Sequence, residues 1–251
     1  MCFDTDSSPP IPVISGAAVS HDDVVLEAAD GNRFAAFFAT PDEPGTTGIV
    51  ILPDVRGLYR FYEELALRFA ERRFPAIAFD YFGRTAGIEK RGDDFDYAPQ
   101  VALTTPEGIQ ADVGAAVAYL RDAGCTSIFT VGFCFGGRNS WFAAAAGHGV
   151  AGAIGFYGMP AERNGIPGPT SRAAEITAPI LALQAGADAN ILPEHNAAFD
   201  AALTKAGVEH EVVTYEGAPH SFFDRKYEEF ADASADAWQR VLAFVERYSG
   251  G

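Results

Sequence analysis

The feature that most constrains the fold is an alternation of two patterns along the chain. Short apolar runs rich in β-branched residues, such as Gly48-Ile-Val-Ile-Leu52, are separated by longer segments in which apolar residues recur with a helical period. This alternation is typical of a mostly parallel sheet with helices on both faces. Strands are predicted at residues 48–52, 75–79, 127–131, 150–157, 179–184 and 209–215, and helices near 59–73, 105–123, 193–206 and 231–248.

Two earlier segments, residues 24–28 and 33–39, are predicted to form an antiparallel hairpin at one edge of this sheet. They flank Asp30-Gly31-Asn32, and Asp-Gly and Gly-Asn pairs favour the positive φ angles of tight hairpin turns. Residues 81–105 lack a clear period, and connections of that length in a compact domain are usually functional. We therefore expect this segment to form a loop on the substrate side of the sheet.

Length and charge narrow the class of protein. A chain of 251 residues with evenly spread apolar positions predicts one α/β domain over residues 1–251. Asp and Glu number 34 against 18 Lys and Arg, and the resulting net charge of −16 repels nucleic acid and anionic membranes. The N-terminus MCFDTDSSPPIPVISG lacks the basic and apolar regions of a signal peptide, which predicts a cytoplasmic protein. The sequence leaves the oligomeric state open.

The cysteines give no sign of a disulfide framework or a metal site. Cys2, Cys125 and Cys134 are an odd set without C-x-x-C spacing, so a reducing compartment fits best. We predict neither a metal nor another cofactor.

The strongest chemical signal is the segment Ile128-Phe-Thr-Val-Gly-Phe-Cys-Phe-Gly-Gly137, which contains G-x-C-x-G. This pattern resembles the nucleophile elbow between a strand and a helix, with cysteine in place of serine. Glycines two residues either side of Cys134 leave room for a strained turn. The N-terminus of the following helix would favour the thiolate. A buried structural cysteine is the alternative, but the position between an apolar strand and a helix favours a nucleophile.

The partners of a nucleophile are expected later in the chain, each just past a strand, in the order acid and then histidine. Pro179-Ile-Leu-Ala-Leu-Gln-Ala-Gly-Ala-Asp188 places a carboxylate after a buried strand. Val212-Val-Thr-Tyr-Glu-Gly-Ala-Pro-His220 ends the last strand in a loop that carries a histidine. Cys134, Asp188 and His220 are therefore predicted to form a catalytic triad, in which Asp188 orients the histidine ring.

These residues give the chain a specific resemblance to the dienelactone hydrolase (carboxymethylenebutenolidase) family. The matching motifs are G-F-C-F-G-G around Cys134, G-F-Y-G at 155–158 and G-A-P-H-S-F-F at 217–223. The resemblance implies the α/β-hydrolase fold, with Cys134 as nucleophile, His220 as base and Asp188 as its orienting acid. It also implies an oxyanion hole formed by the backbone N–H groups of Val55 and Phe135.

Substrate-binding positions match the family less completely. Arg84, in D-Y-F-G-R, stands where the family has an arginine that binds a carboxylate. A second family arginine falls on Asp224, with Arg225 one position later. The resemblance also implies a substrate-binding role for Tyr157 in the G-F-Y-G motif.

A further departure concerns the loop after residues 48–52, where relatives often carry a Glu that holds the resting thiol. This chain has Asp54, one methylene shorter. Two interpretations stay open. Asp54 either lies near Cys134, where it disfavours the thiolate until substrate displaces the carboxylate, or caps the following turn without meeting the sulfur.

Sulfur as the nucleophile also restricts the substrate. A thiolate leaves a tetrahedral intermediate more readily than an alkoxide, so alkyl esters tend to revert, whereas enol-lactones, aryl esters and thioesters proceed to an acyl-enzyme. The predicted function is a hydrolase of small esters or lactones with good leaving groups. A general aryl or carboxylesterase without a dienelactone role is the main alternative. A non-catalytic binding module and a thiol redox protein are less favoured.

Overall fold

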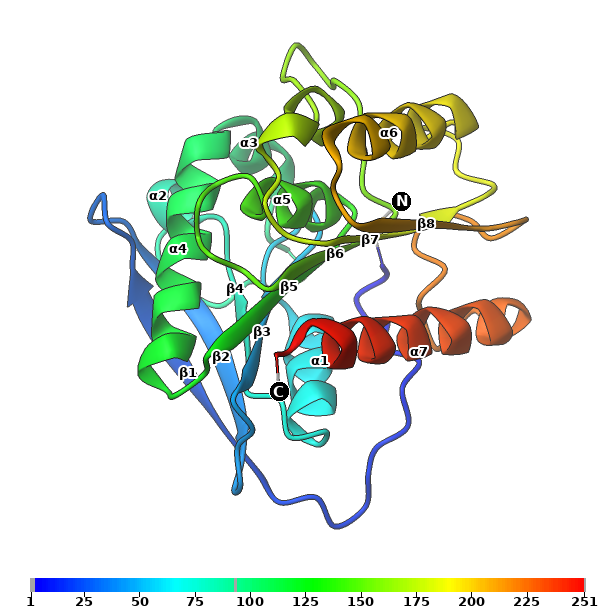
Figure 1. Ribbon diagram of the computed structural model, residues 1–251. Helices are drawn as coiled ribbons and strands as arrows, with labels where there is room; N and C mark the ends of the chain where they lie inside the picture. Colours follow the sequence, from blue (N-terminus) through cyan, green and yellow to red (C-terminus); the bar gives the residue numbers. More distant parts are fainter. Residues whose placement is uncertain (1–2, 93, 251) are drawn as a thin grey trace.

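The computed structural model describes residues 3–92 and 94–250, so Cys2 lies outside the described residues. Within this part of the chain, eight strands form one sheet in the order β1-β2-β4-β3-β5-β6-β7-β8 (Figure 1). β1 pairs antiparallel with β2, as does β2 with β4, and the remaining neighbours are parallel. The strands are β1 (Val19–Glu27), β2 (Arg33–Pro41), β3 (Thr47–Leu52), β4 (Ala76–Phe79), β5 (Ser127–Phe133), β6 (Gly152–Phe156), β7 (Ile180–Ala185) and β8 (His210–Tyr215). The predicted parallel sheet with an antiparallel N-terminal edge is confirmed.

Helices cover both faces of the sheet (Figure 1). α1 (Arg60–Ala70) and α7 (Ala231–Tyr248) lie on one face, while α4 (Pro106–Asp122), α5 (Phe135–Ala143) and α6 (Pro193–Ala206) lie on the other. Aromatic pairs join helices within each layer. The ring centroids of Phe69 and Trp238 are 4.9 Å apart between α1 and α7, and those of Trp141 and Phe199 are 4.9 Å apart between α5 and α6. Each face of the sheet therefore has its own apolar core.

The hairpin at the sheet edge forms at the predicted turn but is longer than predicted. Gly31 has φ 81°, and the Ala28 N–H donates to the Asn32 carbonyl at 2.8 Å. β1 begins at Val19 because the polar residues that follow it pair with β2 while their side chains face solvent. An exposed edge strand lacks the apolar alternation by which a strand is recognised in a sequence.

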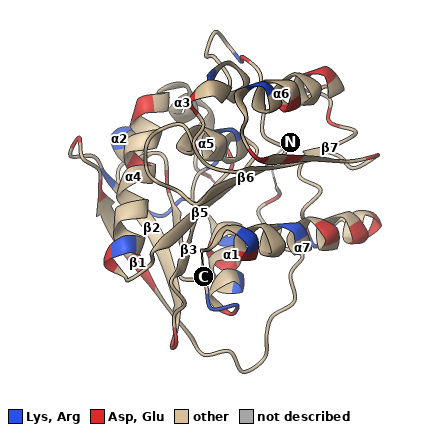
Figure 2. Cartoon of the chain, in the orientation of Figure 1, with Lys and Arg blue, Asp and Glu red and all other residues tan. Residues whose placement is uncertain are grey.

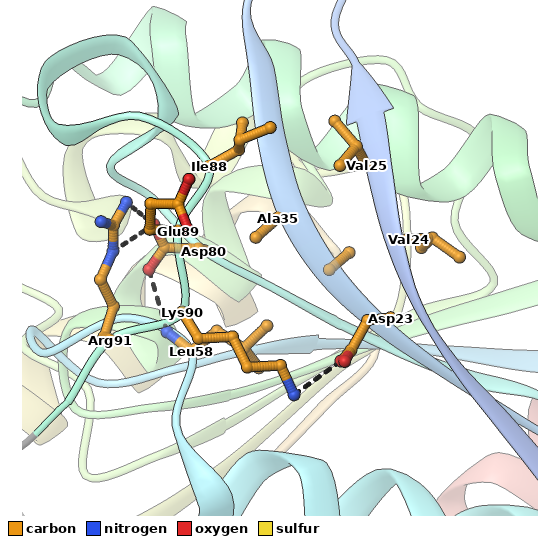
Figure 3. A pocket seen from close by; sticks show the side chains of 11 residues that line it. Asp23, Val24, Val25, Ala35, Leu58, Asp80, Ile88, Glu89, Lys90 and Arg91 are labelled. Atoms are coloured by element: carbon orange, nitrogen blue, oxygen red, sulfur yellow. Dashed lines mark hydrogen bonds and ion pairs between the residues drawn. The ribbon is translucent and has the colours of Figure 1, made fainter.

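The segment between β4 and α4, predicted as a substrate-side loop, divides into two parts with different surroundings. It contains the short helices α2 (Gly83–Ala86) and α3 (Tyr97–Ala102). Its middle part packs against the edge of the sheet around a cavity of about 100 Å³ (Figure 3). There Arg91 bonds the buried Asp80 at 2.9 Å and Lys90 pairs with Asp23 at 2.8 Å. Among the described residues of this segment, only those from α3 onwards contribute to the main cavity described below.

The charged residues of α6 and α7 are mostly exposed, and Figure 2 shows both signs of charge along these two helices. The inward side of α7 carries Trp238, Val241, Phe244 and Val245, which are buried against the sheet. Two short 3₁₀ helices, η1 (Pro169–Glu175) and η2 (Glu228–Phe230), complete the described elements. Over the described residues, every helix falls short of the length and apolarity needed to cross a bilayer.

Candidate active site

Cys134 occupies a sharp turn between β5 and α5. Its φ of 55° and ψ of −110° fall in a region that non-glycine residues rarely adopt. The turn is held by the Cys134 N–H, which donates to the Phe156 carbonyl at 2.9 Å. Because α5 begins at the next residue, the side chain of Cys134 stands at the N-terminus of that helix.

The glycines either side of Cys134 are required by close backbone approach. A Cβ atom on Gly132 would lie 2.0 Å from the Gly136 carbonyl oxygen, and one on Gly136 would lie 2.0 Å from the Leu52 carbonyl oxygen. Neither position has room for a side chain. The structure therefore confirms that the elbow needs both glycines.

Asp188 and His220 meet across the loops that follow β7 and β8. The His220 Nδ1 and Asp188 Oδ2 atoms are 2.5 Å apart. The other carboxylate oxygen accepts the N–H groups of Asn190 at 2.8 Å and Ile191 at 3.1 Å. Burial alone would raise the pKa of Asp188, but hydrogen bonds from His220 and these amides hold the pKa below its usual value. An ionised Asp188 thus fixes the orientation of the imidazole.

Cys134 and His220 border a cavity of about 580 Å³ at the carboxyl end of the parallel strands. Its polar lining includes Cys134, His220, Arg138, Arg163 and several asparagines, and its apolar wall is formed by Val101, Ile109, Phe135, Phe142 and Ile191. Val55 follows β3, Cys134 follows β5 and His220 follows β8. Ligands of open α/β sheets bind at this end of the strands, because the loops converge there.

Comparison with known proteins agrees with this geometry. Residues 34–249 match the model of the dienelactone hydrolase family. The chain belongs to that family. A carboxymethylenebutenolidase from Rhodococcus opacus is 29% identical over 259 residues, which cover 99% of this chain and 97% of the relative. The prediction of a hydrolase of esters or lactones is thus confirmed at the level of the family.

Solved structures support the same fold. A protein from Klebsiella pneumoniae assigned as a dienelactone hydrolase is 26% identical, with a TM-score of 0.81 over 92% of this chain and 100% of that one. A dienelactone hydrolase-like promiscuous phosphotriesterase from metagenomic libraries superposes with a TM-score of 0.76 at 21% identity, over 92% of this chain and 99% of that one. The predicted α/β-hydrolase fold is confirmed.

Tyr157 lies where the family resemblance placed it, in the lining of the cavity. It follows β6 with φ 36°, and its ring centroid is 4.9 Å from that of His220. The side chain is buried, which raises the pKa of its hydroxyl. Among the described residues that hydroxyl has no hydrogen-bond partner. A buried, unsatisfied donor beside a cavity is suited to binding a ligand atom.

Asp54, the position where the chain departs from the family pattern, caps a turn. Its carboxylate accepts the Arg56 N–H at 2.8 Å and the Tyr59 hydroxyl at 2.9 Å, and it pairs with the Arg56 guanidinium at 3.3 Å. It is 1% exposed and precedes Val55 in the chain, and the cavity lining among the described residues includes Val55 but not Asp54. These contacts agree with the turn-capping interpretation. The carboxylate is thus engaged by the backbone and side chains of its own turn.

The two arginines expected to bind a substrate carboxylate lie elsewhere. The Arg84 guanidinium bonds Asp112 at 2.5 Å and Asp30 at 2.8 Å. That of Arg225 donates to the Pro9 and Ile11 carbonyls at 3.0 and 3.3 Å. The cavity lining found among the described residues includes neither arginine. Both expectations are corrected, because these guanidiniums are already engaged by groups from distant parts of the chain.

The arginines that do line the cavity, Arg138 and Arg163, were not predicted from the sequence. Arg138 follows Cys134 by four residues on α5, so it lies on the same side of the helix. That spacing was a usable signal. Arg163 had no comparable signal, since it belongs to an irregular connection between β6 and η1.

Proposed function

We propose that the chain is a cysteine hydrolase that cleaves esters or lactones with good leaving groups. One observation carries the proposal. Cys134 stands at a strained, positive-φ elbow and borders the same cavity as His220, whose ring is held by Asp188. Serine and cysteine hydrolases need this combination of an accessible nucleophile, a base and an orienting acid.

In the proposed reaction the Cys134 thiolate attacks the ester carbonyl. The N–H groups of Val55 and Phe135 stabilise the resulting oxyanion. Collapse of the intermediate breaks the bond to the leaving oxygen or sulfur, which departs as an enolate, phenolate or thiolate. His220 then takes a proton from water, which attacks the acyl-enzyme and releases the carboxylic acid and the thiolate.

Tyr157 is proposed to contact the substrate in this reaction. Its hydroxyl is unpartnered among the described residues and its ring lies against that of His220. A bound ester would present an oxygen as the missing acceptor. The hydroxyl is expected to stay protonated, since burial raises its pKa.

Within this class, the structure favours a broader ester hydrolase over one restricted to dienelactone. Arg84 and Arg225 are engaged by other groups. The cavity of about 580 Å³ also has room for an acyl or aryl group larger than a butenolide ring. Apolar side chains such as Phe135 and Phe142 offer such a group a matching surface.

The test is a reaction with p-nitrophenyl acetate followed by intact-mass detection of an acetyl adduct. Wild type is expected to release p-nitrophenolate and carry the adduct on Cys134, while Cys134→Ala does neither. Cys125→Ala is the matched control, because this thiol is buried and burial raises its pKa to about 11. Cys2→Ala controls for the remaining thiol.

Each alternative gives a different result. A binding module forms no adduct and releases no product, and a redox protein shows oxidation of Cys134 without acyl transfer. Turnover retained in Cys134→Ala would contradict the proposed nucleophile.

A further inference from the structure

One wall of the main cavity is a loop that a single buried arginine holds in place. Arg138 is 8% exposed and projects from α5 into the loop between β6 and η1. Its guanidinium donates to four backbone carbonyls, those of Met159 at 3.4 Å, Ala161 at 2.6 Å, Ile166 at 2.8 Å and Pro167 at 2.7 Å. These acceptors lie on both sides of the loop, so Arg138 fastens its two ends together.

The middle of this loop forms a tight turn, and Arg163 is its first residue. The N–H groups of Arg163 and Ile166 each donate to the carbonyl of the other residue at 3.0 Å. Between them Asn164 and Gly165 have φ angles of 53° and 77°, the combination that closes a two-residue hairpin. Arg163, Asn164 and Ile166 all line the cavity. The turn therefore presents the Arg163 side chain at the cavity from a restrained backbone.

The charge of this cavity is opposite to that of the chain. Asp and Glu outnumber Lys and Arg by 34 to 18 overall, yet the cavity lining among the described residues contains Arg138 and Arg163 and no acidic side chain. Within residues 3–92 and 94–250 neither arginine forms an ion pair. Arg138 meets only neutral acceptors, and its burial and the charge of Arg163 lower its pKa to about 10, which leaves it charged at neutral pH.

We propose that Arg163 is a specificity-determining residue that binds an anionic group on the substrate, with Arg138 as the positioning residue that holds its loop. This inference rests on the proposed function and names the substrates that the site prefers, which are esters whose acyl part ends in a carboxylate. Arg138 lies one helical turn beyond Cys134, about 6 Å along the axis. An acyl chain of a few carbons, bound as a thioester to Cys134, would therefore bring its terminal carboxylate towards this wall.

The contrast with Arg84 explains why Arg163 is available for this role. Arg84 is neutralised by Asp112 and Asp30. Arg163 is an exposed residue that flanks the tip of a hairpin, and within the described residues it forms no ion pair. A substrate carboxylate would bind it without first displacing a protein carboxylate.

The experiment compares two substrates that differ in charge, p-nitrophenyl hydrogen adipate and its neutral analogue p-nitrophenyl methyl adipate. Wild type is expected to prefer the anionic ester, and the preference should fall as salt is added. Arg163→Gln should lower kcat/KM for the anionic ester roughly 10-fold, mainly through KM, and leave the neutral ester within about 2-fold. Arg163→Lys should restore part of the preference. The matched control is Arg60→Gln, which removes one positive charge from an exposed arginine that pairs with Glu64 on α1.

A binding measurement makes the inference independent of turnover. Titration of p-nitrophenyl hydrogen adipate into Cys134→Ala should show binding that is weakened about 10-fold by the added change Arg163→Gln. Arg138→Met should weaken the binding of both esters by a similar factor, because it releases the whole loop. The inference is overturned if Arg163→Gln leaves either the preference between the two esters or the binding to Cys134→Ala unchanged. Failure of the proposed function gives another pattern, in which the neutral ester is also not hydrolysed through Cys134.

Discussion

The carboxylate of Asp54 and the guanidinium of Arg56 form an ion pair two residues apart, with 3.3 Å between Oδ2 and Nη2. The two residues flank Val55 in the chain, and Val55 belongs to the cavity wall. After burial, which is the largest cause, the negative charges of Cys134 and Asp54 are among the causes that raise the pKa of Tyr157. Asp54 and Cys134 therefore lie within electrostatic reach of the same side chain, and Arg56 opposes the charge of Asp54.

This pair predicts opposite effects of two single substitutions on the nucleophile. Asp54→Asn removes a negative charge and is expected to lower the pH at which Cys134 reacts with iodoacetamide by roughly 0.5–1 unit. Arg56→Gln should raise it by a similar amount, and the double variant should lie near wild type. The measurement is the alkylation rate against pH with Cys2 and Cys125 replaced by Ala. Unchanged profiles in both single variants would show that the pair does not act on Cys134.

Tyr157→Phe is expected to lower activity without lowering stability. Its hydroxyl is buried and unpartnered among the described residues, so removing it should leave stability unchanged or raise it by about 1 kcal/mol. If the hydroxyl bonds the substrate, kcat/KM for p-nitrophenyl acetate should fall roughly 10-fold. Thermal unfolding and ester kinetics test both parts. A stable variant with full activity would exclude a role for the hydroxyl in the reaction.

Asp188→Asn should reduce turnover on the order of 10⁴-fold with little change in KM, because the imidazole loses the acceptor that sets its tautomer. It should also change the pH dependence of stability. The pKa of Asp188 is lower in the folded chain than its usual value, so ionised Asp188 stabilises the fold above about pH 4. This contribution is lost as the pH falls through the folded value.

The stability advantage of wild type over Asp188→Asn should therefore shrink as the pH falls from about 5 to about 2. Urea unfolding across that range measures it. A difference that stays constant with pH would mean that Asp188 titrates alike in the folded and unfolded chain.

Arg84→Gln is expected to act on stability rather than on substrate charge. Asp112 is buried, and burial already raises its pKa despite the bonds from Arg84 and Asn32. Loss of the guanidinium should cost about 3 kcal/mol of unfolding free energy, because a buried carboxylate loses its cation. The kcat/KM values for the anionic and neutral adipate esters should change by the same factor. A fall in kcat/KM for the anionic ester alone would show that Arg84 binds the substrate anion.

Arg225→Gln should loosen the N-terminal segment. The guanidinium bonds the Pro9 and Ile11 carbonyls, while the Arg225 N–H donates to the Ser8 carbonyl at 3.0 Å. Losing the two side-chain bonds should cost about 1–2 kcal/mol and speed proteolysis near residue 10. The ratio of kcat/KM for the anionic ester to that for the neutral ester should remain the same as in wild type. Limited proteolysis and chemical unfolding provide the measurements.

The sequence by itself determined the sheet, the elbow and the positions of the acid and the histidine. Runs such as residues 48–52 specify buried strands through local apolar pattern, and the two glycines around Cys134 reflect a requirement of the turn itself. Asp188 and His220 each follow a strand, and parallel strands bring the residues after them to one edge. These features depend on short-range pattern and on the connectivity of a parallel sheet.

Tertiary structure alone decided which of Arg84, Arg163 and Arg225 faces the cavity. Arg84 occupies a position of the family's carboxylate-binding arginines, and Arg225 adjoins another. Their partners come from distant segments. Arg84 pairs with Asp30 and Asp112, and Arg225 donates to the Pro9 carbonyl. Arg163 lines the cavity from a loop whose two ends are bonded by Arg138. The sequence displays the charge of each arginine. Whether that charge is neutralised depends on which groups the completed fold brings within hydrogen-bond distance, and no local pattern encodes those groups.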